Sequence, residues 1–566
     1  MTTAFGLCEF AAHFVQGRWF MVSACFLIMV GTGCTYLFGT YSKAIKSSQG
    51  YDQTTLNLLG FFKDLGGNIG VVSGLISQVT PTWFVFLLGS ALNFCGYFMI
   101  WLTVTSRISK PKVWQMCLYI FMGANSQNYA TTGSLAPCVK NFPESRGVLL
   151  GILKGYAGLG GAIMTQIYLA IYGNDSKSLI LLIAWLPAAI SVVFAYSVRP
   201  VKVVRQPNEL KIFYQFLFAS TALALFLMAM IIIQKRVFFS QAAYAGSATV
   251  VCALLFLPMF IAIRNEYLHW NPQIDGPQTV ESSRPWPLSS SEERRAQNAR
   301  TSCFARIFKK PARGEDYSIL QALLSIDMLI LLFSSFSGLG SSLTALDNFG
   351  QIGESLGYSA NVITSFMSLV SIWNYFGRVF SGFVSEILLH KYKVPRPLML
   401  AFSLILSSAG YLLIAFPVSG SLYVASVITG FSLGAQFPLI YAIVSELFGL
   451  KYFATLFNIA QLSTPLGSYT LNVKVTGYLY DRKAKQQLQR SGKELAKGTE
   501  LTCIGTECYK LPFIILASIT LSGALALLIL AVRTREFYRS DIYKKFRENN
   551  MASAETEMAS TSVQEK

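Results

Sequence analysis

Three basic residues, Lys63, Lys154 and Arg378, stand inside long apolar stretches of the sequence. An ionisable group in the middle of a membrane-spanning helix costs at least about 2.5–3.5 kcal/mol, so such groups usually serve a function. The planar guanidinium of Arg378 suits a carboxylate held by two hydrogen bonds, and a buried lysine can bind an anion or change its protonation. Arg378 and Lys154 therefore predict an anion-binding site. The alternatives are a structural ion pair of the arginine with Asp327 or Glu386, and a lysine that extends toward the cytoplasmic interface.

Lys63 and Asp64 are consecutive residues, so their side chains leave a helix about 100° apart and are not expected to neutralise each other directly. Asp64 and Asn68 lie one turn apart on one face. We expect Asp64, with Lys63 beside it, to take part in ion coupling. The alternative is that these residues hold their helix against another span. Asp327 stands at the start of its own apolar stretch, where an interfacial position is expected.

A run of polar residues, Asn125-Ser-Gln-Asn-Tyr129, interrupts a further apolar stretch. Polar side chains in a membrane helix must line a cavity or be satisfied by neighbouring helices. We expect Asn125 and Asn128 to line a substrate cavity. Tyr36 is a further candidate for this cavity, although aromatic residues at helical spacing usually pack against other helices.

The whole sequence is too apolar for a soluble protein. Apolar residues make up 53% of its 566 residues and charged residues only 13%, whereas soluble globular chains carry about 25% charged residues. This composition excludes a soluble multidomain enzyme and indicates a polytopic membrane protein. The formal net charge of +18 does not require a nucleic-acid partner, because basic residues collect on the cytoplasmic side of membrane proteins.

Fourteen apolar stretches are long enough for membrane-spanning helices, which need about 20 residues. They cover residues 19–41, 56–78, 83–104, 113–137, 148–172, 178–197, 212–233, 243–263, 323–346, 360–385, 397–416, 421–444, 452–473 and 511–532. With a cytoplasmic N-terminus, 27 of the 46 Lys and Arg residues fall on the cytoplasmic side, 16 fall on the other, and three remain in the spans. We therefore expect both termini to be cytoplasmic, in the plasma membrane or in a vacuolar or other endomembrane.

An internal repeat divides the chain. Shifting the sequence by 307 residues aligns glycines at equivalent places in several spans, such as Gly33 with Gly340 and Gly160 with Gly467. The same shift aligns Lys154 with Gln461, which we expect on the opposite side of the cavity. Gly-x3-Gly stripes in residues 66–74 and 147–155 predict close contacts between helix backbones.

The repeat predicts two six-helix bundles with two extra helices between them. The expected parts are an N-terminal bundle (1–200), two additional transmembrane helices (201–264), a cytoplasmic linker expected to be disordered (265–320), a C-terminal bundle (321–535) that includes a long non-cytoplasmic loop (474–510), and a cytoplasmic tail (536–566). Tyr543-Lys-Lys-Phe546 in the tail has the form of a tyrosine sorting signal, or forms an amphipathic turn.

Duplicated six-helix halves resemble the plan of the major facilitator superfamily, in which substrate binds between parallel repeats near the membrane midplane. Three stretches are distinctive: Gly17-Arg-Trp-Phe20, Leu56-Asn-Leu-Leu-Gly-Phe-Phe-Lys-Asp-Leu-Gly-Gly-Asn-Ile-Gly-Val-Val-Ser-Gly74 and Asn141-Phe-Pro-Glu-Ser-Arg-Gly147. In these stretches the chain resembles the plant nodulin-like family, whose members are often labelled "nuclear fusion defective"-like. The resemblance implies a fourteen-helix major facilitator fold and says little about the substrate.

More distantly, Asn374-Tyr-Phe-Gly-Arg378 resembles a helix of the oxalate/formate and monocarboxylate transporters, in which an arginine faces the substrate carboxylate. This resemblance implies that Arg378 and Asn374 contact a small organic anion. In the monocarboxylate carriers an aspartate one turn before the arginine helps to couple protons. Asn374 occupies that position here, so the chain departs from the family's coupling pattern in this helix.

Cys503 and Cys508 lie in the long non-cytoplasmic loop, on a side that is oxidising outside the cell or in the endoplasmic reticulum. They form either a disulfide that pins the loop or two free thiols. The sequence contains only three histidines and no zinc-binding spacing, so neither a metal nor a cofactor is expected. The spans hold no Walker lysine after a glycine-rich loop and no Ser/His/Asp arrangement, which argues against an ATP-driven pump and against an enzyme.

These features predict a secondary active transporter that moves a small solute by alternating access. A small organic anion of the monocarboxylate kind, with ion coupling, fits the intramembrane cations. The alternatives are a transporter-fold sensor or scaffold without flux, and a carrier of amino-acid-like or metal-chelate solutes. The expected partners are the solute and the lipid bilayer, without nucleic acid, and the chain is expected to be a monomer.

Overall fold

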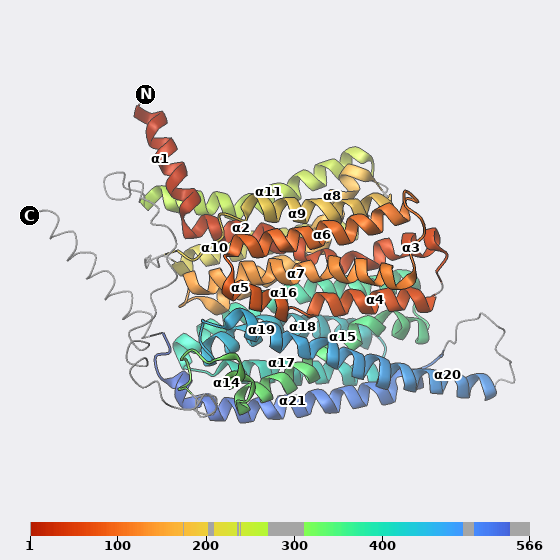
Figure 1. The fold of residues 1–566 in the computed structure, drawn as a ribbon. Coiled ribbons are helices and arrows are strands. Elements are labelled where there is room, and N and C mark those ends of the chain that lie inside the picture. Colours follow the sequence, from red (N-terminus) through yellow and green to blue (C-terminus); the bar gives the residue numbers. More distant parts are fainter. Residues whose placement is uncertain are drawn as a thin grey trace, which may run out of the picture.

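The computed structural model describes residues 2–51, 53–173, 175–201, 209–234, 237, 239–269, 311–490 and 503–543. In these ranges the regular structure is helical and contains no strand. Long helices lie side by side, with the N-terminal part of the sequence above and the C-terminal part below in Figure 1. The all-α fold predicted from the apolar stretches is confirmed.

The N-terminal bundle contains α1 (Thr2–Gln16), α2 (Arg18–Thr32), the 3-10 helix η1 (Gly33–Leu37), α3 (Phe38–Gln49), α4 (Gln53–Asn68), α5 (Val71–Val79), α6 (Thr82–Val104), α7 (Val113–Asn141), α8 (Arg146–Tyr172) and α9 (Ser176–Phe194). The two extra helices are α10 (Glu209–Gln234) and α11 (Gln241–His269). The C-terminal bundle contains α14 (Ile319–Leu323), α15 (Ile326–Ser355), α16 (Ala360–Tyr392), α17 (Arg396–Ala415), α18 (Ser421–Leu447), α19 (Phe453–Ser468), the π-helix η2 (Tyr469–Gly477), α20 (Tyr478–Arg490) and α21 (Glu507–Arg539).

Each predicted span corresponds to one helix or to consecutive helices. Within the described ranges, 10 helices are long and apolar enough to cross a membrane. The predicted spans 56–78, 113–137, 360–385 and 452–473 do not meet that limit. The first and last are interrupted, between α4 and α5 and between α19 and η2, and the other two carry more polar residues. These four spans contain Lys63, Asn125, Arg378 and Gln461.

The internal repeat recurs in the helix contacts. A Cβ atom at Gly33 would lie 2.7 Å from the Cα atom of Gly160, and a Cβ atom at Gly340 would lie 2.7 Å from the Cα atom of Gly467. Real Cβ contacts are not that short, so both contacts require glycine. The two pairs are related by the 307-residue shift, which supports a duplication of the bundle.

The two bundles also meet through glycines. A Cβ atom at Gly382 of α16 would lie 2.8 Å from the Cα atom of Gly151 of α8, and one at Gly74 of α5 would lie 2.7 Å from the Cα atom of Thr455 of α19. Both glycine stripes predicted from the sequence thus contribute glycines to the interface between the halves. Contacts of this kind let backbones approach closely without interlocking side chains.

The predicted loop 474–510 differs from the structure over its first part. There, η2 and α20 continue α19 as helix to Arg490, and α20 extends past the neighbouring helices (Figure 1). The sequence analysis did not predict this helix, because it followed apolar residues, whereas α20 is rich in Lys, Arg, Gln and Leu, which are strong helix formers without being apolar as a group. The placement of residues 474–510 on the non-cytoplasmic side stays a prediction. A disulfide joins Cys503 to Cys508 with an S–S distance of 2.05 Å.

The two ends of the described chain lie at the same end of the bundle, as an even number of crossings requires (Figure 1). We call it the terminal end, and it is marked by α1 and the last turns of α21. Most of the predicted linker and tail, residues 270–310 and 544–566, lies outside the described residues, as does the Tyr543-Lys-Lys-Phe546 motif apart from its tyrosine.

Candidate functional site

Two basic side chains meet between the halves, Arg378 from the middle of α16 and Lys154 from the N-terminal part of α8. The Nη1 atom of Arg378 donates a hydrogen bond of 2.6 Å to the backbone carbonyl of Lys154, and Nη2 donates one of 3.1 Å to the hydroxyl of Tyr36. The Arg378 side chain is 3% exposed and Lys154 is 8% exposed, whereas Tyr36 is 57% exposed. The two cations are therefore buried together beside a tyrosine that reaches the surface.

Aromatic rings of α18 face both cations. The Cζ atom of Arg378 lies 5.2 Å from the ring centroid of Phe437, and the Nζ atom of Lys154 lies 4.9 Å from that of Tyr441. A ring face attracts a cation by about 0.5–2 kcal/mol, which is less than the several kcal/mol needed to remove one ion from water. The rings compensate only part of the cost of burying two like charges.

No acidic side chain of the described residues forms an ion pair with Arg378 or Lys154. The structural pairs considered for Arg378 are absent from those ranges, because Asp327 is held by two other arginines at 2.8 and 2.9 Å. Glu386 is held by Arg396 at 2.8 Å. The Nε hydrogen of Arg378 is also buried without an acceptor in the described part of the chain. The site thus offers unmatched positive charge and a free hydrogen-bond donor.

Polar side chains of the C-terminal half connect this site to α4. The Tyr441 hydroxyl donates to Gln461 Oε1 at 2.8 Å, and Gln461 Nε2 donates to Asn68 Oδ1 at 3.3 Å. Lys154 and Gln461, which the sequence repeat relates, therefore flank the same tyrosine. Asn374 lies one turn before Arg378 and is buried.

A second charged cluster involves Lys63, Asp64 and Asp347. Lys63 Nζ lies 2.8 Å from Asp64 Oδ1, so the expectation that these neighbours do not neutralise each other is wrong. The angle between adjacent helical positions describes where side chains start, and the long lysine stem bridges it. Asp347 of α15 is within electrostatic range of both residues and accepts a hydrogen bond of 3.1 Å from Asn472 of η2.

Asp347 was missed from the sequence because the predicted ninth span ended one residue before it. Its signal was present, because Asp347 directly follows residues 328–346, a run of 19 residues without an acidic side chain. A wider span boundary would have added it to the list of intramembrane acids.

Asn125 and Asn128 bind backbone in this structure. Asn125 Nδ2 donates to the carbonyls of Gly66 and Ile69 at 2.9 and 2.8 Å, and Asn128 Nδ2 donates to the Gly66 carbonyl at 2.9 Å. These carbonyls lie where α4 ends and the chain turns into α5. Both amides therefore satisfy the interrupted helix, and their expected contact with solute stays a prediction.

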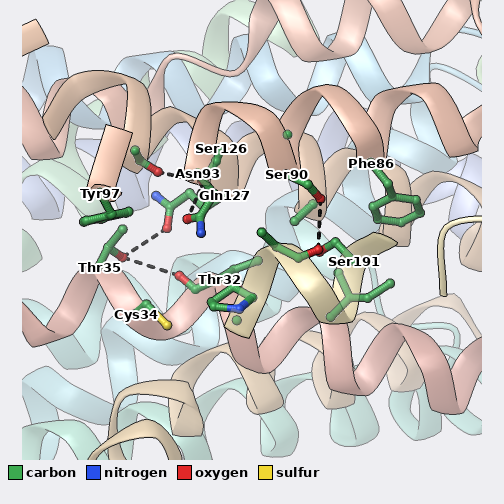
Figure 2. A pocket seen from close by; sticks show the side chains of 17 residues that line it. Thr32, Cys34, Thr35, Phe86, Ser90, Asn93, Tyr97, Ser126, Gln127 and Ser191 are labelled. Atoms are coloured by element: carbon green, nitrogen blue, oxygen red, sulfur yellow. Dashed lines mark hydrogen bonds between the residues drawn. The ribbon is translucent and has the colours of Figure 1, made fainter. Parts of the chain in front are cut away.

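A small cavity of about 20 Å³ lies inside the N-terminal bundle, among α2, η1, α6, α7 and α9. Figure 2 shows the Thr35 hydroxyl turned toward Gln127, to whose Oε1 atom it donates at 3.0 Å, and Ser126 turned toward Asn93 at 3.1 Å. Such a volume holds about one water molecule. This cavity belongs to one bundle and is separate from the site between the halves.

At the terminal end, an ion cluster closes the contact between the halves. Arg396 of α17 binds Glu386 at 2.8 Å and Glu446 of α18 at 2.7 Å. Glu386 also accepts a hydrogen bond of 2.9 Å from the backbone nitrogen of Gly147, and Arg146 Nη1 donates to the Ser445 carbonyl at 3.1 Å. The first turn of α8 is thereby bound to the C-terminal half.

The arrangement of the helices is the major facilitator fold. Solved structures of XylE share this fold. A double-tryptophan mutant aligns with a TM-score of 0.54 at 12% identity, over 90% of this chain and 94% of that one. The proton:xylose symporter XylE bound to 6-bromo-6-deoxy-D-glucose aligns with a TM-score of 0.51 at 12% identity, over 92% and 95%.

In its sequence, the N-terminal part of the chain is similar to the nodulin-like family. The nodulin-like family model matches residues 18–263, and a model described as "NFD4, C-terminal domain" matches residues 315–540. "Protein NUCLEAR FUSION DEFECTIVE 4" of Arabidopsis thaliana is 24% identical over 541 residues, 92% of this chain and 89% of that protein. "Probable transporter MCH1" of Wickerhamomyces anomalus is 24% identical over 164 residues, 29% and 33% of the two chains. The fold and these relatives support a secondary transporter.

Proposed function

We propose that this chain is a secondary transporter of small organic anions, and that Arg378 and Lys154 bind the solute carboxylate. The observation that carries the proposal is the burial, between the two halves, of two cations without an acidic partner among the described residues. A carboxylate would accept hydrogen bonds from the free Nε of Arg378 and from the Lys154 ammonium. Charge-assisted bonds of this kind are about twice as strong as neutral ones.

The same cations favour an anion over an amino-acid-like solute. The ammonium group of a zwitterion needs an acidic partner, and Asp64, an acid of the N-terminal half, is already held by Lys63 at 2.8 Å. Metal-chelate solutes with several carboxylates remain within the same chemistry. A screen of labelled carboxylates separates these substrate classes.

Alternating access fits the contacts of the two halves. The ion cluster joins the halves at the terminal end, and Tyr36, which accepts a hydrogen bond from Arg378, is 57% exposed. We expect solute to approach the cation site from the side of Tyr36. In this mechanism the halves rock about the bound solute. The glycine contacts of α8 and α16 suit such motion, because few side chains must be repacked.

We further propose that Asp64 and Asp347 carry the coupling ion, with a proton as the first candidate. They come from opposite halves and share the electrostatic field of Lys63. Rocking of the halves would change their separation and therefore their joint charge. Ion coupling would then take place outside α16, in which Asn374 stands where monocarboxylate carriers have an aspartate.

The test is uptake of labelled monocarboxylates into proteoliposomes, with and without an inward pH gradient. We expect saturable uptake that Arg378→Ala abolishes, while the matched control Lys391→Gln, an exposed cation near the end of the same helix, keeps it. Uptake by Arg378→Ala equal to that of the unchanged chain would refute the assigned site. A sensor without flux would show no uptake for any solute, whereas a carrier keeps its flux after deletion of residues 270–310.

A further inference from the structure

A groove with a cavity volume of about 500 Å³ lies between the two extra helices, α10 and α11. Lys211, in the first turn of α10, and Arg264, near the end of α11, line it toward the terminal end. Phe218, Ala222, Leu257 and Ile261 line it further along the helices. At about 1.5 Å of rise per residue, Ala222 lies about 16 Å from the level of Lys211. The groove is therefore charged at one end and apolar over the depth of a membrane leaflet.

The two cations of this groove are exposed, and neither has an ion-pair partner among the described residues. The nearest acids on the same helices are engaged elsewhere, since Glu209 binds Arg18 at 2.6 Å and Glu266 lies 3.7 Å from His13. Two amides of the groove, by contrast, satisfy each other: Asn265 Nδ2 donates to Gln215 Oε1 at 2.9 Å. The polar end of the groove thus keeps its positive charge for an external ligand.

The groove opens on the part of the surface that faces lipid. Only 39% of the most apolar stretch of α10, and 28% of that of α11, is buried inside the protein. Phe218 is 70% exposed and Leu268 is 67% exposed. In a membrane protein of this class, such apolar surface is covered by acyl chains. An occupant of the groove must therefore combine an anionic head with an apolar body.

We infer that this groove binds one anionic glycerophospholipid from the leaflet at the terminal end. The phosphate lies between Lys211 and Arg264, and an acyl chain follows Phe218 and Leu257 between the helices. Basic pockets between transmembrane helices recognise anionic headgroups in this way. The site is separate from the proposed solute site and does not depend on the transported solute.

The test uses the full chain in detergent and native mass spectrometry, with dioleoylphosphatidylglycerol and dioleoylphosphatidylcholine as the two probes. We expect one phosphatidylglycerol to bind in preference to phosphatidylcholine. Each cation contributes about a five-fold gain in affinity near a membrane surface, so Lys211→Gln with Arg264→Gln should weaken phosphatidylglycerol binding about 25-fold and leave phosphatidylcholine unchanged. The matched control, Arg535→Gln with Arg539→Gln, removes two exposed cations from α21 at the same end and should change neither.

A second variant separates the groove from diffuse attraction. Ala222→Trp fills the apolar part and keeps both cations, so it should also remove the preference for phosphatidylglycerol. Retention of that preference by either the double variant or Ala222→Trp, or an equal loss in the α21 control, would overturn the inference. Displacement of the lipid by millimolar inorganic phosphate would assign the cations to free phosphate and would also overturn it.

Discussion

Arg378 and Lys154 occupy positions that a purely structural role does not explain. Each is buried, neither has an acid within the described part of the chain to balance it, and Arg378 keeps one unsatisfied N–H group. Burial of unpaired charge lowers the stability of the protein, because each ion loses several kcal/mol of hydration. We therefore expect that retaining the two charges lowers the stability of the protein and strengthens solute binding. Removing one of them should raise the unfolding temperature and weaken the affinity for solute.

Lys154→Gln removes one of the two buried like charges and keeps a polar side chain of similar reach. We expect the unfolding temperature to rise by several degrees, because desolvation and repulsion from Arg378 are relieved. The KM for a monocarboxylate should rise about ten-fold or more, since hydrogen bonds to charged groups contribute about 1.5–3 kcal/mol. Thermal unfolding in detergent and concentration-dependent uptake measure the two effects, with Lys391→Gln as the exposed control. A lower unfolding temperature together with an unchanged KM would contradict the proposed role.

Asp347→Asn tests the coupling cluster. The amide keeps a hydrogen-bond acceptor for Asn472 but cannot gain or lose a proton. We expect stimulation of uptake by a pH gradient to disappear, while exchange of labelled for unlabelled solute continues. Glu354→Gln, an exposed position two turns further along α15, should leave stimulation intact. If Asp347→Asn and Asp64→Asn both keep the full response to the gradient, the coupling site lies elsewhere.

At the scale of residues, the sequence predicted which charged residues lie inside the spans, but it did not predict which residues they contact. Arg378 and Lys154 could be found because a charge in an apolar run is conspicuous at any depth. The contact of Lys63 with Asp64 was predicted wrongly, because a helical wheel ignores the length of the lysine stem. The sequence also could not predict which groups the Asn125 and Asn128 amides bind. Their polarity requires a polar partner, and only the fold shows that the partner is backbone of α4.

The interruption between α4 and α5 explains why α7 is polar. Where a helix is broken inside a membrane, carbonyl groups lose their intrahelical partners and must be satisfied by neighbours. Asn125 binds two such carbonyls and Asn128 one. A Cβ atom at Gly70 in this break would collide with Asn458 of α19. The interrupted segment therefore also brings the two halves into contact beside the cation site.

Asn125→Ala separates a structural role for the amide from a role in solute binding. It removes two hydrogen bonds and leaves the Ile69 carbonyl without this donor, while Asn128 still binds the Gly66 carbonyl. An unsatisfied buried group costs about 1–3 kcal/mol. We expect a lower unfolding temperature and an unchanged solute Kd. Ser371→Ala, which removes an exposed hydroxyl bonded only to its own helix, should change neither. A ten-fold loss of solute affinity without a loss of stability would instead indicate that Asn125 contacts the solute.

At the scale of elements, the apolar runs predicted where the spans lie. The runs that were interrupted or less apolar also indicated which helices surround the site. The four predicted spans that are interrupted or less apolar in the structure contain Lys63, Asn125, Arg378 and Gln461. A helix that faces a polar site must give up apolar residues, so a low hydropathy marked the helices that surround the site. Apolar runs could not predict the continuation of α19 into η2 and α20. This part of the helix extends beyond the apolar span, so its residues do not need to be apolar.

At the scale of the whole molecule, a charged cluster at the terminal end joins the two halves. Arg146, Arg396, Glu386 and Glu446 together carry no net charge, and their side chains are at most 3% exposed. Removing one member leaves an unpaired buried charge, which costs about 3–5 kcal/mol. Two hydrogen bonds join the cluster to the N-terminal half, from the Gly147 backbone nitrogen to Glu386 and from Arg146 to the Ser445 carbonyl. Glu386 is the acid of the cluster that contacts the N-terminal half directly, so its charge is expected to help hold the terminal end closed.

Glu386→Gln should shift the halves toward a state that is open at the terminal end. A shift of about 3 kcal/mol changes the ratio of two conformations more than a hundred-fold. Spin labels at Tyr196→Cys and Lys391→Cys, two exposed positions at that end on opposite halves, should report a new, longer distance by double electron–electron resonance in a background without other reactive cysteines. Glu507→Gln, exposed at the opposite end, is the control. An unchanged distance distribution in Glu386→Gln would show that the cluster does not hold the halves together.

The last described turn of the chain adds Tyr543 to this cluster, and its two parts should act differently. Its hydroxyl lies 3.2 Å from both Glu386 Oε1 and Glu446 Oε1, within the C-terminal half. Its ring lies 5.6 Å from the guanidinium of Arg146, in the N-terminal half. Tyr543→Phe should therefore lower the unfolding temperature and keep the spin-label distance. Tyr543→Ala should lower the unfolding temperature and also lengthen the distance, because only this variant removes the ring against which Arg146 packs. Equal distances in the two variants would show that the C-terminal turn stabilises its own half without closing the terminal end.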